Sequence, residues 1–290
     1  MSRSSVRNYA EHLRLWLIRT FTPWRYQKAA ILWTASHYDM SSEHAEDFFA
    51  KIYLHFIRQD IKDTFGDKKI RILDVGCGQG RLSIPLAQDG HRITGIDISS
   101  EAIRIAGQRA QKQNITLDLR LIDITRDTMA FPVNSFDCII CTEMIYMVER
   151  PENLLRLFTR LANPGGLVIV SFRPKMYYVL NAILRKSWKD LKIISATKGS
   201  ILNGISLNWF TLNEAIALLE DAGITLRRAC SIGKFSGIEG DPQARFCNPA
   251  ELDNKARKYL MELEIRQAEA NADSGRYLYT SGTVTKITQR

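Results

Sequence analysis

The sequence predicts an α/β protein built on a mostly parallel sheet, and three observations support this fold class. Short apolar runs alternate with helix-like segments between about residue 70 and residue 171. The first run leads into glycines at alternate positions, Asp74-Val-Gly76-Cys-Gly78-Gln-Gly80, and the second run ends at Asp97. Crossover helices join parallel strands, and ligands bind beyond the carboxyl ends of those strands. The pattern therefore predicts a ligand site at one edge of the sheet.

In chain order the segments fall into three regions. Residues 1–66 carry apolar side chains at helical spacing, with a break at Pro23 and a later amphipathic run at 45–61. The alternating core follows, with strands predicted at 70–75, 92–97, 119–123, 136–144 and 167–171, and helices beginning at 81 and 152. Beyond a segment at 174–210 we expect a helix at 211–222, a strand at 225–232, a helix at 250–270 and a closing antiparallel strand at 276–285.

The glycine turn indicates which cofactor the site takes. Gly76, Gly78 and Gly80 leave no Cβ to hold a ligand away from the backbone. Dinucleotide enzymes prefer Gly-x-Gly-x-x-Gly, whereas here the third glycine comes one residue early, which favours S-adenosylmethionine over NAD. Asp97 lies 21 residues after Gly76, the spacing at which a carboxylate accepts hydrogen bonds from ribose hydroxyls. Asp123 ends the third predicted strand and could meet an adenine amino group.

These motifs resemble those of class I S-adenosylmethionine-dependent methyltransferases of the small-molecule type, over residues 70–171 and again over 211–223. The resemblance implies a Rossmann-like methyltransferase fold: a mostly parallel seven-stranded sheet with an antiparallel last strand, an N-terminal helical cap and helical insertions. It divides the chain into a cap at 1–66 and a methyltransferase domain at 67–290, with insertions at 174–210 and 233–274. The residues that it assigns to the cofactor are Asp74, Gly76, Cys77, Gly78, Gly80, Asp97, Ile98, Asp123, Ile124 and Thr142.

The acceptor side is less well defined. Relatives that methylate ubiquinone precursors carry Glu-x-x-Glu-His after the fourth strand, with the later pair implicated in metal binding. This chain has Glu143-Met-Ile-Tyr146-Met147 instead, so we expect no metal. Tyr146 is the candidate catalytic residue, which would orient the acceptor; a role as a pocket wall is equally consistent. Tyr38 resembles a tyrosine that many relatives place over the cofactor, or packs between helices.

Charge provides a further indication of the acceptor. The chain has a net charge of +9, and residues 1–33 and 174–210 each hold six basic residues against one acidic residue. If both segments cover the acceptor side, they attract an anionic acceptor or an anionic surface. Solvated helix faces would explain the same charges. No separate RNA-binding module and no motif for a flipped base is present, so no nucleic-acid partner is expected.

The cysteines and the hydropathy indicate the cellular context. Five cysteines form no disulfide framework, and Cys138 and Cys141 lie three apart on a predicted strand, on opposite faces, which favours a structural role over a redox pair. No apolar run approaches a membrane span, so we expect a cytoplasmic enzyme. We expect methyl transfer without a metal to a small molecule that is anionic or lipid-like. The alternatives are a nucleic-acid or protein methyltransferase, a non-catalytic cofactor-binding protein, and a membrane-surface protein using Trp16, Phe21 and Trp24. The atom methylated and the oligomeric state are left open.

Overall fold

The computed structural model describes residues 45–196, 198–202 and 205–285. Its central sheet has seven strands in the order β3-β2-β1-β4-β5-β9-β8. The parallel strands are β1 (Arg71–Val75), β2 (Arg92–Asp97), β3 (Asp118–Leu121), β4 (Phe136–Cys141) and β5 (Ala162–Phe172). The last strand, β9 (Tyr277–Val284), runs antiparallel to both β5 and β8 (Ile224–Ile232). The predicted sheet, including its antiparallel last strand, is confirmed.

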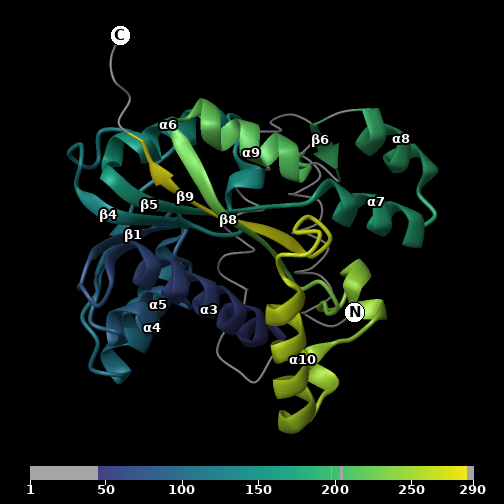
Figure 1. Ribbon diagram of the computed structural model, residues 1–290, viewed down its shortest axis with the longest axis horizontal. Helices are drawn as coiled ribbons and strands as arrows, with labels where there is room; N and C mark the ends of the chain where they lie inside the picture. Colours follow the sequence, from purple (N-terminus) through teal and green to yellow (C-terminus); the bar gives the residue numbers. More distant parts are fainter. Residues whose placement is uncertain (1–44, 197, 203–204, 286–290) are drawn as a thin grey trace, which may run out of the picture.

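Helices cover both faces of this sheet (Figure 1). On one face lie α3 (Ala45–Phe65), α4 (Ser83–Gln88) and α5 (Ser100–Lys112), and on the other lie α6 (Pro151–Leu161) and α9 (Leu212–Asp221). Strands covered on both faces read as continuous apolar runs, and the central strands β1 and β4 have this composition. The core therefore consists of two layers, one on each side of the sheet.

Local signals in the sequence explain where the helices begin. Ser99 caps α5 by accepting a hydrogen bond from the Ala102 N–H. Thr211 and Glu214 form a reciprocal capping box at the start of α9. α6 begins with Pro151, which tolerates the first helical position because its missing N–H has no partner there. The predicted helix starts at 152 and 211 are accordingly displaced by one residue at most.

Other elements differ from the prediction. The segment at 174–210 forms α7 (Lys175–Leu184), α8 (Trp188–Ala196) and an unpredicted hairpin of β6 (Gly199–Leu202) and β7 (Ile205–Asn208). The predicted helix at 250–270 shortens to α10 (Asn254–Gln267), because Asp253 caps it there. The predicted strand at 167–171 is longer, because β5 begins at Ala162 and includes Asn163-Pro-Gly-Gly, opposite a register shift in β4, where Gly165 has a φ of +77°. Short 3-10 turns complete the chain: η1 (Ile145–Met147), η2 (Pro242–Arg245) and η3 (Pro249–Glu251).

The expected cap at residues 1–66 is described only from residue 45. Its amphipathic run is α3, which packs on the sheet through buried side chains that include Phe48, Phe49 and Ile52. The expectations for Trp16, Phe21, Trp24 and Tyr38 lie outside the described residues. The division of the chain into a cap and a methyltransferase domain with two insertions stays a prediction.

Candidate active site

A cavity of about 760 Å³ opens at the carboxyl ends of β1, β2 and β4, within the usual size range of small-molecule sites. Most of the residues predicted to bind cofactor or acceptor line this one cavity: Gly76, Cys77, Gly78, Asp97, Ile98, Asp123, Ile124, Thr142 and Tyr146. Residues up to 70 positions apart in the sequence therefore meet at the sheet edge where the strand pattern placed them. Asp74 and Gly80 are not among the lining residues.

The glycine turn after β1 is held against β2 by backbone hydrogen bonds. The N–H groups of Gly76 and Cys77 both donate to the Ile96 carbonyl, at 2.8 and 3.0 Å. Gly78 has a φ of +52°, and a Cβ built there would meet no atom within 4 Å. The space beside Gly78 is therefore open to a ligand that approaches the bare backbone, which is what a cofactor cradle requires.

Asp97, at the end of β2, fixes the turn from the other side. Its carboxylate accepts hydrogen bonds from the Gly78 N–H at 2.9 Å and from the Ser99 N–H at 2.8 Å. The side chain is buried, and this burial raises the pKa of the carboxyl despite the two donors. A carboxylate has about four lone-pair sites, so Asp97 keeps acceptor capacity for ribose hydroxyls.

Asp74 and Gly80 support the turn from behind. The Asp74 carboxylate accepts a hydrogen bond from the Ser83 hydroxyl of α4 at 2.5 Å. Burial raises the pKa of Asp74 to about 6, although Ser83 and Arg81 both oppose this shift. Gly80 has a φ of +85°, and a Cβ there would lie 3.1 Å from Ile84. Both positions are better placed to shape the loop than to contact a ligand.

The adenine end of the predicted site follows β3. Asp123 lies two residues beyond the end of this strand and accepts hydrogen bonds from the Thr125 N–H and hydroxyl. Ile124 is buried beside it, and Ile98 lines the same part of the cavity after Asp97. These residues offer an apolar slot with a carboxylate at its edge, which suits a purine ring with an exocyclic amine.

The other half of the cavity lies beyond β4, β5 and β9. Thr142 is buried after β4, and Glu143 has a φ of +58°, which turns the chain into η1. The Glu143 carboxylate lies 2.6 Å from the Arg81 guanidinium. Tyr146, on η1, is buried, and its ring lies 6.2 Å from that of Tyr277. An aromatic wall with charged groups at its margin therefore faces the cofactor half.

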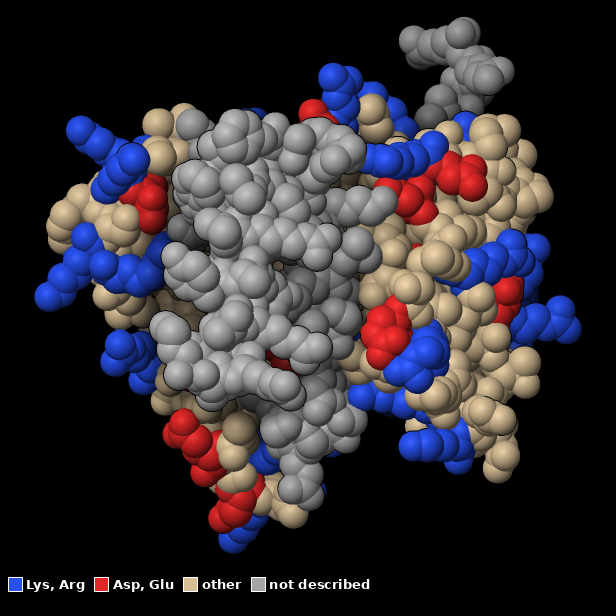
Figure 2. All heavy atoms as spheres, turned by 180° about the vertical axis from the view of Figure 1, so that it is seen from behind, with Lys and Arg blue, Asp and Glu red and all other residues tan. Residues whose placement is uncertain are grey.

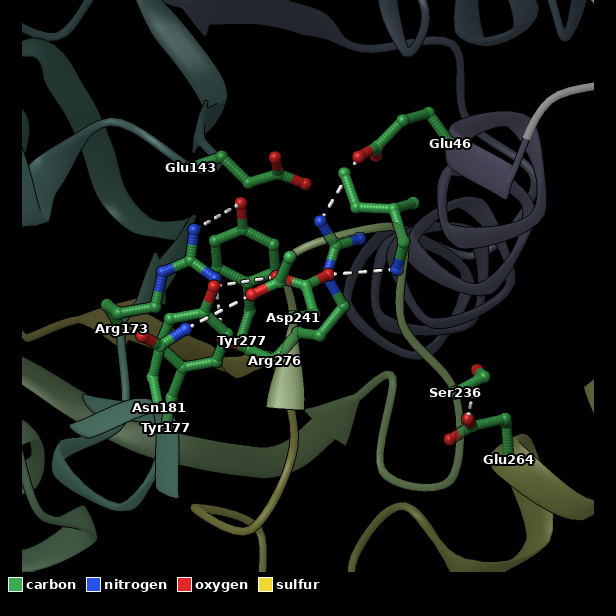
Figure 3. A network of polar contacts seen from close by, with 12 residues as sticks. Glu46, Glu143, Arg173, Tyr177, Asn181, Ser236, Asp241, Glu264, Arg276 and Tyr277 are labelled. Atoms are coloured by element: carbon green, nitrogen blue, oxygen red, sulfur yellow. Dashed lines mark hydrogen bonds and ion pairs between the residues drawn. The ribbon is translucent and has the colours of Figure 1, made fainter. Parts of the chain in front are cut away.

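Four lining residues on this side, shown with their neighbours in Figure 3, were not among the predicted site residues: Arg173, Asp241, Arg276 and Tyr277. Arg173 directly follows β5, and Arg276 directly precedes β9. Because β9 is antiparallel, its first residue lies at the edge where the parallel strands end. A charged residue at the border of an apolar strand marks these two arginines in the sequence, as it marks Asp97.

Among the five cysteines, Cys77 is the one that lines the cavity. Burial raises the pKa values of the Cys77, Cys138 and Cys141 thiols, so none is activated as a nucleophile.

The exposed side chains Arg185, Lys186 and Lys189 do not line the cavity. Figure 2 shows basic side chains spread around the described surface, with acidic ones among them. The described residues contain no group of three or more His, Cys, Asp or Glu side chains arranged to hold a metal ion.

Comparisons with known proteins agree with this geometry. Residues 73–170 match a family model described as a methyltransferase domain. A ubiquinone biosynthesis O-methyltransferase from Actinobacillus pleuropneumoniae serotype 7 is 34% identical over 121 residues, which is 41% of this chain and 50% of the relative. The chain therefore spans about half the length of this curated relative.

Solved structures show the same fold at low identity. Magnesium protoporphyrin IX methyltransferase (ChlM) from Synechocystis, with bound S-adenosylmethionine, has a TM-score of 0.52 and 16% identity, over 92% of this chain and 97% of that chain. The [4+2]-cyclase SpnF has a TM-score of 0.52 and 20% identity, over 80% of each chain. The sheet order, the glycine turn and the family match together define a class I methyltransferase fold. Within that fold, residues 73–170 are similar to S-adenosylmethionine-dependent methyltransferase domains.

Proposed function

We propose that this protein transfers a methyl group from S-adenosylmethionine to a small-molecule acceptor. The observation that supports this most is that one cavity joins the glycine turn and Asp97 to the aromatic half around Tyr146 and Tyr277. A donor and an acceptor can therefore lie in contact without crossing solvent. A separate docking module for RNA or protein is not needed to explain the site.

The cofactor half divides along the sheet edge. We assign the backbone at Gly76 and Gly78 to the methionine part, Asp97 to the ribose, and Asp123 with Ile124 to the adenine. The positions of these residues at the ends of β1, β2 and β3 support the assignment, as does the resemblance in the sequence. Cys77, Ile98 and Thr142 complete the walls, while Asp74 and Gly80 act through the loop.

The chemistry asks mainly for alignment. S-adenosylmethionine supplies a methyl group on a sulfonium, and its product is a neutral thioether that leaves readily. Holding the acceptor in line supplies about 7–11 kcal/mol of such a barrier. Tyr146, buried against the aromatic wall, is placed to fix the orientation of an acceptor ring.

The acceptor is proposed to be a hydroxyl group that is methylated without a metal. The name of the matched relatives, ubiquinone biosynthesis O-methyltransferase, favours a hydroxyl acceptor. Tyr146 and Met147 occupy the positions where related sequences carry Glu and His, so we propose transfer without a metal. Activity that is unchanged after treatment with EDTA would support this, and activity restored only by added Mg²⁺ or Zn²⁺ would contradict it.

The cytoplasmic location and the peripheral membrane contact stay predictions. No helix in the described part of the chain combines the length and the apolar composition that a membrane crossing requires. Flotation with anionic lipid vesicles measures the membrane contact directly.

The proposed activity is tested with labelled cofactor and host extract. The protein is incubated with S-adenosylmethionine labelled in the methyl group, and the products are fractionated into small molecules, RNA and protein. We expect label in a small-molecule fraction, with a mass gain of one methyl group, and none with heat-denatured protein. Label in RNA or protein would favour the alternative acceptors. Cofactor binding without any labelled product would identify a protein that uses this fold for something other than methyl transfer.

A further inference from the structure

We propose that Arg173 binds a single carboxylate group of the acceptor, so that the substrate is a monoanionic aromatic acid. This inference rests on the proposed function and specifies its substrate class. It depends on a buried guanidinium in the cavity that has no acidic partner.

Arg173 lies on the acceptor half of the site. It follows Phe172, the last residue of β5, and lines the same cavity as the glycine turn. In the sheet order, β5 is separated from the cofactor strands β1, β2 and β3 by β4. Only 9% of Arg173 is exposed, so its charge has been removed from bulk water. Burying a charge costs free energy unless a partner group offsets it, so the residues around Arg173 should include such a partner.

Two other arginines that line the cavity, Arg81 and Arg276, are shielded from solvent and already have carboxylate partners. Arg81 lies 2.6 Å from Glu143, and Arg276 pairs with Glu46 at 3.1 Å and with Asp241 at 2.5 Å. Arg173 forms no ion pair with any described residue, and its Nε–H has no hydrogen-bond partner among them. Figure 3 shows Glu46 and Asp241 beside Arg276, and a dashed line that joins the Arg173 guanidinium to the Tyr277 hydroxyl.

Neutral groups surround the Arg173 guanidinium instead. It donates from Nη2 to the Tyr277 hydroxyl at 2.8 Å and from Nη1 to the Arg276 carbonyl at 3.1 Å. Its Cζ lies 3.9 Å from the ring centre of Tyr277, 4.3 Å from that of Tyr177 and 5.0 Å from that of Tyr146. Aromatic faces offset part of the desolvation cost. These contacts are with a carbonyl and with tyrosine side chains, so the positive charge is oriented but not neutralised.

The chemistry of the pocket selects the anion. A planar guanidinium fork matches a carboxylate. Glu143 and Asp241 line the same cavity and repel an incoming anion. This repulsion is about half as strong for a singly charged carboxylate as for a doubly charged phosphate monoester. The rings of Tyr146 and Tyr277, inclined to each other by 39°, form an aromatic wall beside Arg173, which suits an aromatic ring. An aromatic acid satisfies all three conditions.

Benzoate and benzamide form a matched pair of probes, because they share a ring and a size and differ in charge. Each is titrated into the full chain at constant ionic strength, with and without saturating S-adenosylhomocysteine, and binding is followed by ligand-observed NMR. We expect wild-type protein to bind benzoate at least about 10-fold more tightly than benzamide, as a charge-assisted hydrogen-bonded pair requires. Arg173→Gln should lose this preference and keep its affinity for S-adenosylhomocysteine.

Two further variants separate binding from folding. Arg173→Lys keeps the charge and should keep part of the preference, although it loses the planar fork. Arg228→Gln is the control, because it removes another largely buried arginine, which pairs with Asp60 and Glu269 outside the cavity. It should destabilise the fold and leave the preference for benzoate intact.

The outcomes distinguish this inference from the proposed function. Equal binding of the two probes by wild type, a preference that survives in Arg173→Gln, or no saturation by about 50 mM benzoate would overturn the assignment of Arg173. Absence of binding by S-adenosylhomocysteine would instead overturn the proposed function, and the titrations without it would still decide the role of Arg173.

Discussion

Replacing Asp97 by alanine tests the cofactor site at the residue that both shapes and lines it. In the structure its carboxylate accepts two backbone N–H groups, those of Gly78 and Ser99, at 2.9 and 2.8 Å, and only 8% of the residue is exposed. Alanine removes the proposed ribose contacts and also leaves both donors without their partner. The variant should therefore lose both affinity for the cofactor and free energy of unfolding.

For affinity, each hydrogen bond to a charged group contributes about 1.5–3 kcal/mol, so the loss of even one weakens binding by roughly 10-fold or more. For stability, a stranded buried donor costs about 1–3 kcal/mol, and water entering from the cavity should hold the cost near the lower end. For a chain of this size, a loss of about 2 kcal/mol lowers Tm by roughly 4–8 °C, so the variant should remain folded.

The assay is calorimetric titration with S-adenosylhomocysteine at a temperature where the variant is folded by circular dichroism. Asp118→Ala is the matched control, because Asp118 lies on the neighbouring strand, pairs with Arg120 at the surface and does not line the cavity. The control should bind with wild-type affinity. A folded Asp97→Ala protein with wild-type affinity would refute the ribose assignment.

Three other predictions concern the turn, the buried acid and the aromatic wall. Gly78→Val should abolish cofactor binding, because its side chain would occupy the open space beside the turn; Gly66→Val, at a similar φ of +64° but away from the cavity, should show the same backbone strain in Tm without loss of binding. Burial raises the pKa of Asp74 to about 6, above the unfolded value of about 3.9. Between these two pH values the folded protein binds a proton that the unfolded chain has lost, so the free energy of unfolding falls as pH rises through this range. Relative to Asp74→Asn, wild type should lose about 3 kcal/mol between about pH 4 and pH 7 in urea unfolding, and parallel profiles of the two proteins would contradict this. Tyr146→Phe should lower kcat for the true acceptor by about 10-fold or more with unchanged affinity for S-adenosylhomocysteine if the hydroxyl orients the acceptor, whereas unchanged kcat would make it a wall residue only.

Much of the fold follows from local features that the sequence displays. Strand β2 ends at Asp97 as predicted, because a continuous apolar run stops at a carboxylate that finds backbone donors there. α9 begins where Thr211 and Glu214 complete a capping box. The predicted start of the fifth strand at residue 167 is wrong, since β5 begins at Ala162 and accommodates Gly165, with a φ of +77°, as an irregularity.

The lining of the cavity was predicted where it depends on one segment and missed where it depends on tertiary pairing. The glycine turn is local, so its position in the cavity followed from spacing alone. Arg173, Asp241 and Arg276 lie in different parts of the chain, and their contacts exist only because β9 inserts next to β5. The net charge of the segment at 174–210 predicts a basic margin at the acceptor side, yet its exposed side chains Arg185, Lys186 and Lys189 do not line the cavity. Composition indicated charge near the acceptor but not which arginine is buried.

The central claim is that the cavity binds S-adenosylmethionine and uses it as the methyl donor. Its most direct test is a competition experiment in which methyl-labelled S-adenosylmethionine is bound to the protein and displaced by S-adenosylhomocysteine or NADH. We predict displacement by S-adenosylhomocysteine with one site per chain, no displacement by NADH, and loss of the bound label in Gly78→Val. Displacement by NADH with equal or greater affinity, or label that stays bound in Gly78→Val, would contradict the account.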